Sequence, residues 1–125
     1  MADRIARGRA AYTRGVAAEA AACQALAADG WAVLARRVRT ASGEIDVVAE
    51  RDGLLALVEV KSRPTLSDAA VSVSPRQRAR LLAAAEIVLA ENLGWGANGV
   101  RFDVMVVDAT GRVRRVADAF RQEEL

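Results

Sequence analysis

Lys61 is the residue whose type most clearly indicates chemistry, because it is the single lysine among 18 basic residues. An arginine stays cationic at any ordinary pH, whereas a lysine is a compact, rotatable donor whose pKa can shift. Glu59 precedes Lys61 by two residues, and Asp46 lies in the apolar segment before it. Two carboxylates and an ammonium could together hold a divalent cation and a water molecule.

The residue types that the chain lacks narrow this chemistry. It has no histidine and a single cysteine, Cys23. A histidine general base, a Ser-His or Cys-His nucleophile pair and a Cys/His zinc site are therefore excluded. Cys23 lies among alanines at helical spacing, and we expect a small core residue. A bound metal would have to be ligated by oxygen, so the expected cofactor is Mg²⁺ or Mn²⁺.

The length of 125 residues fits one domain, residues 1–125, with a modest core. The N-terminus is rich in arginine without a continuous apolar segment, and no stretch approaches the roughly 20 apolar residues that span a membrane. We therefore expect a soluble, cytoplasmic protein without a membrane partner. Residues 1–9 could form a flexible basic tail.

Charge is unevenly distributed, although the net charge is only +2. Residues 1–40 hold seven arginines against three acidic residues, whereas residues 41–75 hold three basic residues against six acidic ones. An acidic centre between basic segments would suit a polyanion bound over a metal site. Ordinary mixed surface charge would give the same totals.

The elements that must position these residues follow the order αβββαββ, which is typical of a mixed α/β domain. Alanine-rich helical spacing predicts a helix over residues 10–28 that ends at Gly30, and Ser74-Pro75 predicts the start of a second helix that runs to about Asn92. The predicted strands cover residues 31–39, 44–49, 54–61, 100–107 and 113–117, with a loop over residues 62–73 and turns at residues 52–53 and 108–111.

A two-residue turn at Asp52-Gly53 makes Asp46 face Glu59 and Glu44 face Lys61 on one side of a hairpin. Facing like charges destabilise a hairpin by up to about 1 kcal/mol, and a cation would compensate for this cost. The alternative is a solvated face on which Glu44 pairs with Lys61. The apolar residues expected on the other side are Ile45, Val47, Ala49, Ala56, Val58 and Val60.

Glu19 belongs by helical spacing to the apolar face that carries Cys23 and Leu26. Carboxylates are seldom buried unless they are paired or metal-bound, so Glu19 either joins the site or lies at the edge of that face. Phosphate binding and plain solvation are both open for the arginines that could contact nucleic acid. These are Arg14, Arg36, Arg37, Arg39, Arg63, Arg76 and Arg80.

Three segments resemble the YraN-like family of small bacterial proteins: residues 43–49 (Gly-Glu-Ile-Asp-Val-Val-Ala), residues 57–63 (Leu-Val-Glu-Val-Lys-Ser-Arg) and residues 101–104 (Arg-Phe-Asp-Val). That family is similar to the archaeal Holliday-junction resolvases and belongs to the PD-(D/E)xK nuclease superfamily. The resemblance implies a restriction-endonuclease-like fold, with a mixed central sheet flanked by helices. It covers nearly the whole chain.

The resemblance implies that Asp46 and Glu59 bind the metal together with the backbone carbonyl of Val60. Lys61 would orient or help deprotonate the attacking water. Glu19 matches an acidic residue on the first helix of the resolvases, where it would act on the metal directly or through water.

Other positions extend or depart from the family pattern. Glu44 belongs to the family motif, and its expected role is to pair with Lys61. Arg76 stands where the family commonly has lysine, which would keep a phosphate contact but not a proton-transfer role. Asp103 is expected to face solvent or to support the sheet, and Trp31 to lie in the core.

The first hypothesis is a metal-dependent DNA endonuclease, structure-selective or sequence-nonspecific, that acts on branched or damaged DNA. No helix-turn-helix and no cluster of base-reading side chains is evident. The alternative is a protein of nuclease fold that binds nucleic acid or a partner without cleavage. A homodimer formed through an apolar patch at residues 93–95 is a further option.

Overall fold

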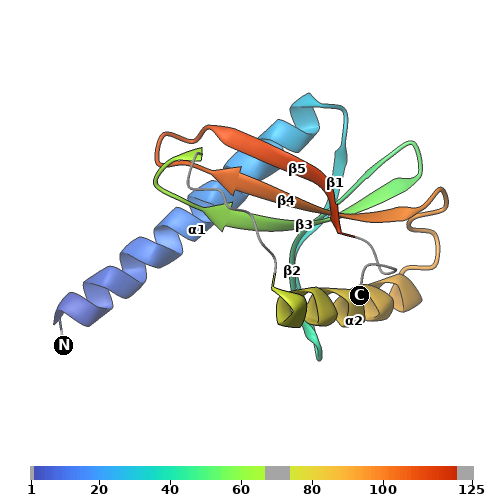
Figure 1. Ribbon diagram of the computed structural model, residues 1–125, viewed down its shortest axis with the longest axis horizontal. Coiled ribbons are helices and arrows are strands. Elements are labelled where there is room, and N and C mark those ends of the chain that lie inside the picture. The colour runs from blue at the N-terminus through green and yellow to red at the C-terminus, as the bar shows by residue number, and fades with distance from the viewer. Residues whose placement is uncertain (1, 67–73, 121–125) are drawn as a thin grey trace.

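Five strands and two helices make up the part of the chain that the computed structural model describes, residues 2–66 and 74–120 (Figure 1). In chain order they are α1 (Ala2–Ala28), β1 (Ala32–Thr40), β2 (Gly43–Arg51), β3 (Leu54–Ser62), α2 (Pro75–Glu91), β4 (Val100–Val107) and β5 (Val113–Phe120). The predicted order αβββαββ is confirmed. Most of the predicted loop, residues 67–73, lies outside the described residues.

The first helix begins earlier than the sequence predicts. Residues 2–9, predicted as a flexible tail, are the first turns of α1, because the alanines and arginines there favour a helix over a coil. Figure 1 shows the N-terminal part of α1 extending beyond the edge of the sheet. No helix of the described residues is both long and apolar enough to cross a membrane.

The strands form one mixed sheet in the order β1-β2-β3-β4-β5. All neighbouring strands are antiparallel except β3 and β4, which run parallel. A parallel pair needs a crossover connection, and α2 lies in that connection. The described residues therefore form a single mixed α/β domain whose two edge strands are β1 and β5.

The sheet is buried on both faces by a helix packed against each. The α1 face is covered by Ala18, Ala22, Cys23 and Leu26, and the α2 face by Leu81, Ala84, Ala85 and Val88. Because Val48, Leu55 and Leu57 are buried against α2, the hairpin does not have the single apolar face that the sequence predicts. A strand covered on both sides reads as a continuous apolar run, as residues 54–58 do.

The turn chemistry expected from the sequence is confirmed. At the end of α1, Gly30 has φ +84°, and the N–H of Trp31 donates to the Leu26 carbonyl at 3.0 Å, which is a Schellman C-cap. Ser74 caps α2 in a reciprocal capping box with Gln77. Asp52 and Gly53 both have positive φ, +53° and +78°, as a two-residue hairpin turn requires.

Candidate active site

Strands β2 and β3 separate at Asp46, and this separation creates the candidate site. From the turn to the pair Val47–Val58, every residue has the predicted partner. Beyond that pair, the N–H of Val60 donates to Oδ2 of Asp46 at 2.8 Å. The carboxylate takes the place of a backbone acceptor on the facing strand. The predicted facing pairs of Asp46 with Glu59 and Glu44 with Lys61 are therefore wrong, because the regular ladder ends before it reaches them.

Side-chain alternation along β2 also breaks at Asp46. Ile45 and Val48 both belong to the core on the α2 face, whereas Val47 belongs to the core on the α1 face. The prediction that Ile45 and Val47 share a face is wrong, since strict alternation holds only for a regular strand. As a result, Asp46 lies where it can be reached from both faces of the sheet.

Two pockets meet at Asp46, one on each face of the sheet. The α1-side pocket, of about 310 Å³, is lined by Glu19, Arg37, Arg39, Glu44, Asp46 and Ser62 among others. The α2-side pocket, of about 240 Å³, is lined by Glu44, Asp46, Glu59, Gln77 and Arg80 among others. Asp46 and Glu44 border both pockets, so a ligand in either one would contact the same carboxylates.

The site holds negative charge that is poorly compensated. Burial, together with the nearby charge of Asp46, raises the pKa of Glu59 to about 7, against the opposing effects of Lys61 and Arg80. Burial also raises the pKa of Asp46, and the charges of Glu19 and Glu44 add to this rise, while the hydrogen bond from Val60 opposes it. Both carboxylates would be stabilised in their ionised form by a cation between them.

Lys61 is partly buried and lies on the same side of β3 as Glu59, two residues away. Its charge acts on Glu59 and Asp46 together. Glu44 instead pairs with Arg39, its partner in the β1–β2 register, at 3.4 Å. The predicted pair of Glu44 with Lys61 is therefore wrong, and the charge of Lys61 acts instead on the two site carboxylates.

Glu19 lies on the inward face of α1, as its spacing predicts, with its side chain 12% exposed. Arg37 Nε lies 3.2 Å from Oε1 and 3.1 Å from Oε2 of Glu19. Arg37 is one of two non-glycine residues with positive φ among the described residues, at +50°. Glu19 thus borders the pocket that contains Asp46, but its carboxylate is held by an arginine.

The donor atoms of the site fit a hard divalent cation. Asp46 and Glu59 offer carboxylate oxygens, and the carbonyl of Val60 points to the same side of β3 as its N–H, toward the separated β2 strand. Oxygen atoms of this kind are the ligands that Mg²⁺ and Mn²⁺ prefer. Across residues 2–66 and 74–120, however, no three acidic, histidine or cysteine side chains are grouped closely enough to hold a metal ion. Two carboxylates and a carbonyl are the donor set that the fold brings together.

The predicted phosphate-binding arginines divide into two groups. Arg37 and Arg39 line the α1-side pocket, and Arg80 lines the α2-side pocket. The other four are not among the pocket-lining residues: Arg14 on α1, Arg36 on β1, Arg63 after β3 and Arg76 on the first turn of α2, all of them exposed. Of these predicted phosphate-binding arginines, the ones that line the two pockets therefore come from β1 and α2.

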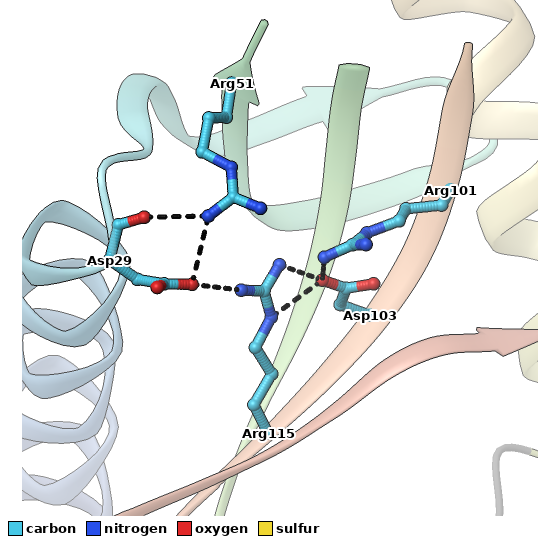
Figure 2. Close-up of polar contacts among 5 residues, drawn as sticks. All are labelled: Asp29, Arg51, Arg101, Asp103 and Arg115. Atoms are coloured by element: carbon cyan, nitrogen blue, oxygen red, sulfur yellow. Dashed lines mark hydrogen bonds and ion pairs between the residues drawn. The ribbon is translucent and has the colours of Figure 1, made fainter.

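Sequence reasoning missed a second polar cluster, which we call the Trp31 clasp. Its residues are Asp29, Trp31, Arg51, Arg101, Asp103 and Arg115. Figure 2 shows the five charged residues among them. Asp103 is 1% exposed and accepts hydrogen bonds from Arg115 Nε at 2.9 Å and Arg101 Nη2 at 3.1 Å. Of its two expected roles, Asp103 has the structural one, because it is buried in the sheet. Arg101 and Asp103, two residues apart on one strand face, were the only signal of this cluster in the sequence.

The aromatic ring at the centre of the clasp contacts three arginines. The guanidinium carbons of Arg51, Arg101 and Arg115 lie 4.9, 4.8 and 4.7 Å from the Trp31 ring centroid. Arg115 and Arg51 also pair with Asp29 at the end of α1, each at 3.4 Å. The clasp thus ties α1 to β2, β4 and β5, and its expected core residue Trp31 is confirmed as buried.

Comparison with known proteins assigns the chain to a family. The family described as "Uncharacterised protein family UPF0102" matches residues 18–107, which span Glu19, both site strands and Asp103. The chain belongs to the UPF0102 family. The YraN-like relationship inferred from the sequence motifs is thereby confirmed.

Relatives within the UPF0102 family match the chain over most of its length. A UPF0102 protein of Granulibacter bethesdensis is 60% identical over 121 residues, which cover 97% of this chain and 77% of the relative. One from Acidiphilium cryptum is 46% identical, covering 97% of this chain and 94% of the relative. One from Azorhizobium caulinodans is 44% identical, covering 94% of this chain and 89% of the relative.

Replacing Glu59 with glutamine is expected to stabilise the protein above neutral pH. The folded-state pKa of Glu59, about 7, is raised from 4.5, so its contribution to stability is fully present below about 4.5 and is lost as pH rises through 7. After allowance for partial solvent exposure, the Gln variant should be more stable by about 1–3 kcal/mol at pH 8. Thermal unfolding in EDTA at pH 5, 6, 7 and 8 measures this difference. A constant difference at all four pH values would contradict it, and Glu86→Gln, an exposed carboxylate on α2, is the control.

Proposed function

We propose that this UPF0102 protein is a metal-dependent DNA endonuclease of the PD-(D/E)xK superfamily, with a restriction-endonuclease-like fold. The single observation that carries the proposal is that Asp46 and Glu59 line one pocket where β2 and β3 separate, with the charge of Lys61 acting on both carboxylates. A charged face without function would be solvated, whereas these carboxylates are half-buried and repel each other. Half-buried carboxylates that repel each other are typical of functional sites, where a bound cation compensates for their charge.

The roles of the residues follow from their donor atoms. Asp46, Glu59 and the carbonyl of Val60 would hold Mg²⁺ or Mn²⁺. When bound, such a cation supplies positive charge that polarises the scissile phosphate and acidifies water. Lys61, with three rotatable N–H donors, would position the attacking water and hold it by hydrogen bonds. With the cation acidifying the water and Lys61 positioning it, no histidine general base is needed, and the chain has no histidine.

The proposed substrate is a DNA backbone in branched or damaged DNA in the cytoplasm, read without base contacts. Arg37 and Arg39 on one side of Asp46 and Arg80 on the other could contact the phosphates that flank the scissile bond. Arg14, Arg36, Arg63 and Arg76 would extend this contact over a longer stretch of backbone. Contacts to phosphates position a nucleic acid but do not read its sequence, which favours selectivity for structure.

The test is cleavage of a panel of DNA substrates by the unmutated protein and by Asp46→Ala. Four-way junction, flap, single-stranded and linear duplex DNA would be incubated with Mg²⁺, Mn²⁺ or EDTA. We expect cleavage that requires the metal, and a loss of at least about 100-fold in Asp46→Ala because a ligand is removed. Absence of cleavage by the unmutated protein, or equal cleavage by both proteins, would refute the enzyme proposal.

The second candidate function is DNA binding without cleavage, and one observation favours it. Glu19 is held by Arg37, so the carboxylates of the described residues are not gathered into a complete metal site. Under this candidate function, the DNA panel would be bound with an affinity that falls steeply with salt. Binding would be the same in EDTA and in Mg²⁺, and no product would form.

A further inference from the structure

The ion pair between Arg37 and Glu19 lies in the α1-side pocket of the candidate site. Glu19 is nearly buried, and Arg37 is about one-third exposed. Both side chains line the α1-side pocket together with Asp46. Arg37 donates from a single nitrogen, Nε, to both oxygens of Glu19, and a hydrogen bond between two charged groups is charge-assisted. In this state Glu19 is neutralised by an arginine at the edge of the proposed metal site.

The backbone that presents Arg37 is strained. Its φ of +50° lies in the left-handed region, which is unfavourable for a non-glycine residue. Arg37 lies between the pairs Arg36–Val47 and Val38–Ile45, at the register position opposite Asp46. Strain of this kind persists where the surrounding structure holds it, and it is concentrated at functional sites. The strain therefore supports a role for Arg37 that a relaxed strand would not provide.

We propose that Arg37 is a positioning residue that exchanges Glu19 for a phosphate of the bound DNA strand and so releases the Glu19 carboxylate to the metal site. The inference rests on the proposed function and adds a means of regulation to it. Arg37 is well suited to both partners, because a guanidinium matches the geometry of carboxylates and phosphates alike. The α1-side pocket already brings Arg37 and Asp46 together.

Coupling between metal and DNA follows from this exchange. A cation at Asp46 competes with Arg37 for Glu19, and a phosphate competes with Glu19 for Arg37. Each ligand therefore removes the obstacle to the other, and by linkage each raises the affinity of the other by the same factor. The incomplete grouping of carboxylates among the described residues is the arrangement expected before DNA binds. The protein would bind its metal firmly only on DNA, which would limit cleavage elsewhere.

The test measures Mn²⁺ affinity of the full chain with and without a DNA probe. The probe is a 12-nucleotide single-stranded oligodeoxynucleotide with phosphorothioate linkages, whose integrity is checked after each titration. For the unmutated protein we expect a rise in Mn²⁺ affinity of about tenfold on addition of the probe. Arg37→Asn should bind Mn²⁺ about tenfold more tightly without the probe and show no further rise. Asparagine tolerates a positive φ, so the backbone of β1 should be preserved.

Three further variants separate this role from a structural one. Arg37→Lys should restore both the low affinity without probe and the rise on its addition, because an ammonium can again pair with Glu19. Glu19→Gln should show no rise, since it has no carboxylate to release. Arg114→Asn, an exposed arginine on the opposite edge strand β5, is the control for loss of one charge and should behave as the unmutated protein does.

The outcomes distinguish this inference from the proposed function. If the unmutated protein cleaves DNA and binds Mn²⁺, yet Arg37→Asn shows the same affinity and the same rise, the inference is overturned and the proposed function stands. If no protein binds Mn²⁺ under either condition, both fall. Removal of a merely structural Arg37 would lower the melting temperature and would raise metal affinity only through the lost positive charge, but the further rise on addition of the probe would remain.

Discussion

Lys61→Arg is expected to lower the rate of DNA cleavage by at least about 100-fold while the protein stays folded. A loss of about 100-fold is the lower end of the range for removal of a proton-transfer or water-positioning group. The variant keeps the positive charge near Asp46 and Glu59. It replaces a compact ammonium with a larger planar group whose donors have fixed directions. Because Lys61 is partly buried beside both carboxylates, the guanidinium cannot place a donor at the same point. Single-turnover cleavage with Mg²⁺ on the best substrate of the panel measures the effect.

The comparison needs variants that separate charge, fold and chemistry. Arg114→Lys makes the reverse exchange at an exposed position on β5 and should cleave as the unmutated protein does. Lys61→Gln removes the charge and should lose at least as much activity as Lys61→Arg. Binding of the DNA probe by Lys61→Arg should stay within about threefold, because the charge is kept. Full activity in Lys61→Arg would show that Lys61 is only a local cation.

The elements of the fold could be predicted because their signals are local. Apolar periodicity, the Ser74-Pro75 cap, Gly30 and the Asp52-Gly53 turn each act within a few residues of the chain, and each was confirmed. The early start of α1 was missed because residues 2–9 have no capping signal or apolar periodicity to mark a helix. The helix forms there because alanine and arginine have high helix propensity. A basic N-terminus is compatible with either a helix or a coil until its surroundings are known.

The site could be predicted only in part, because its geometry depends on where two strands separate. The hairpin register was right through Val47 and Val58, since a two-residue turn fixes it. Beyond that pair, nothing in the sequence indicated that the Asp46 carboxylate would accept a hydrogen bond from the N–H of Val60. The pairing of Glu19 with Arg37 joins residues 18 positions apart, on a helix and a strand, and no spacing rule connects them.

The Trp31 clasp as a whole could not be predicted from the sequence for the same reason. Asp29 and Arg115 are 86 positions apart, and Arg51 joins them from the hairpin turn (Figure 2). Charges along a chain do not reveal which of them will be buried together. A buried aspartate with two arginine partners can be found only once the parallel pairing of β3 with β4 and the antiparallel β5 are known.

Asp103→Ala is expected to destabilise the protein by about 3–5 kcal/mol, which would lower the melting temperature by about 10–20 °C. The Asp103 side chain is fully buried, and its loss would leave Arg101 and Arg115, each about one-fifth exposed, without their shared carboxylate. Uncompensated buried charge of this kind is among the most costly defects in a protein. Glu86→Ala, which removes an exposed carboxylate from α2, should change stability by less than about 0.5 kcal/mol.

The same variant separates a structural role of the clasp from a role in binding. Asp29 directly follows α1 and lies ten positions after Glu19, about 15 Å along the helix axis. Loss of Asp103 should therefore loosen the end of α1 without removing a site residue. Below its melting temperature Asp103→Ala should therefore keep the metal dependence of cleavage, with Asp46→Ala as the reference for its loss. Unchanged stability would mean that the clasp contributes nothing to the fold, and loss of metal dependence in a folded Asp103→Ala would place Asp103 in the site itself.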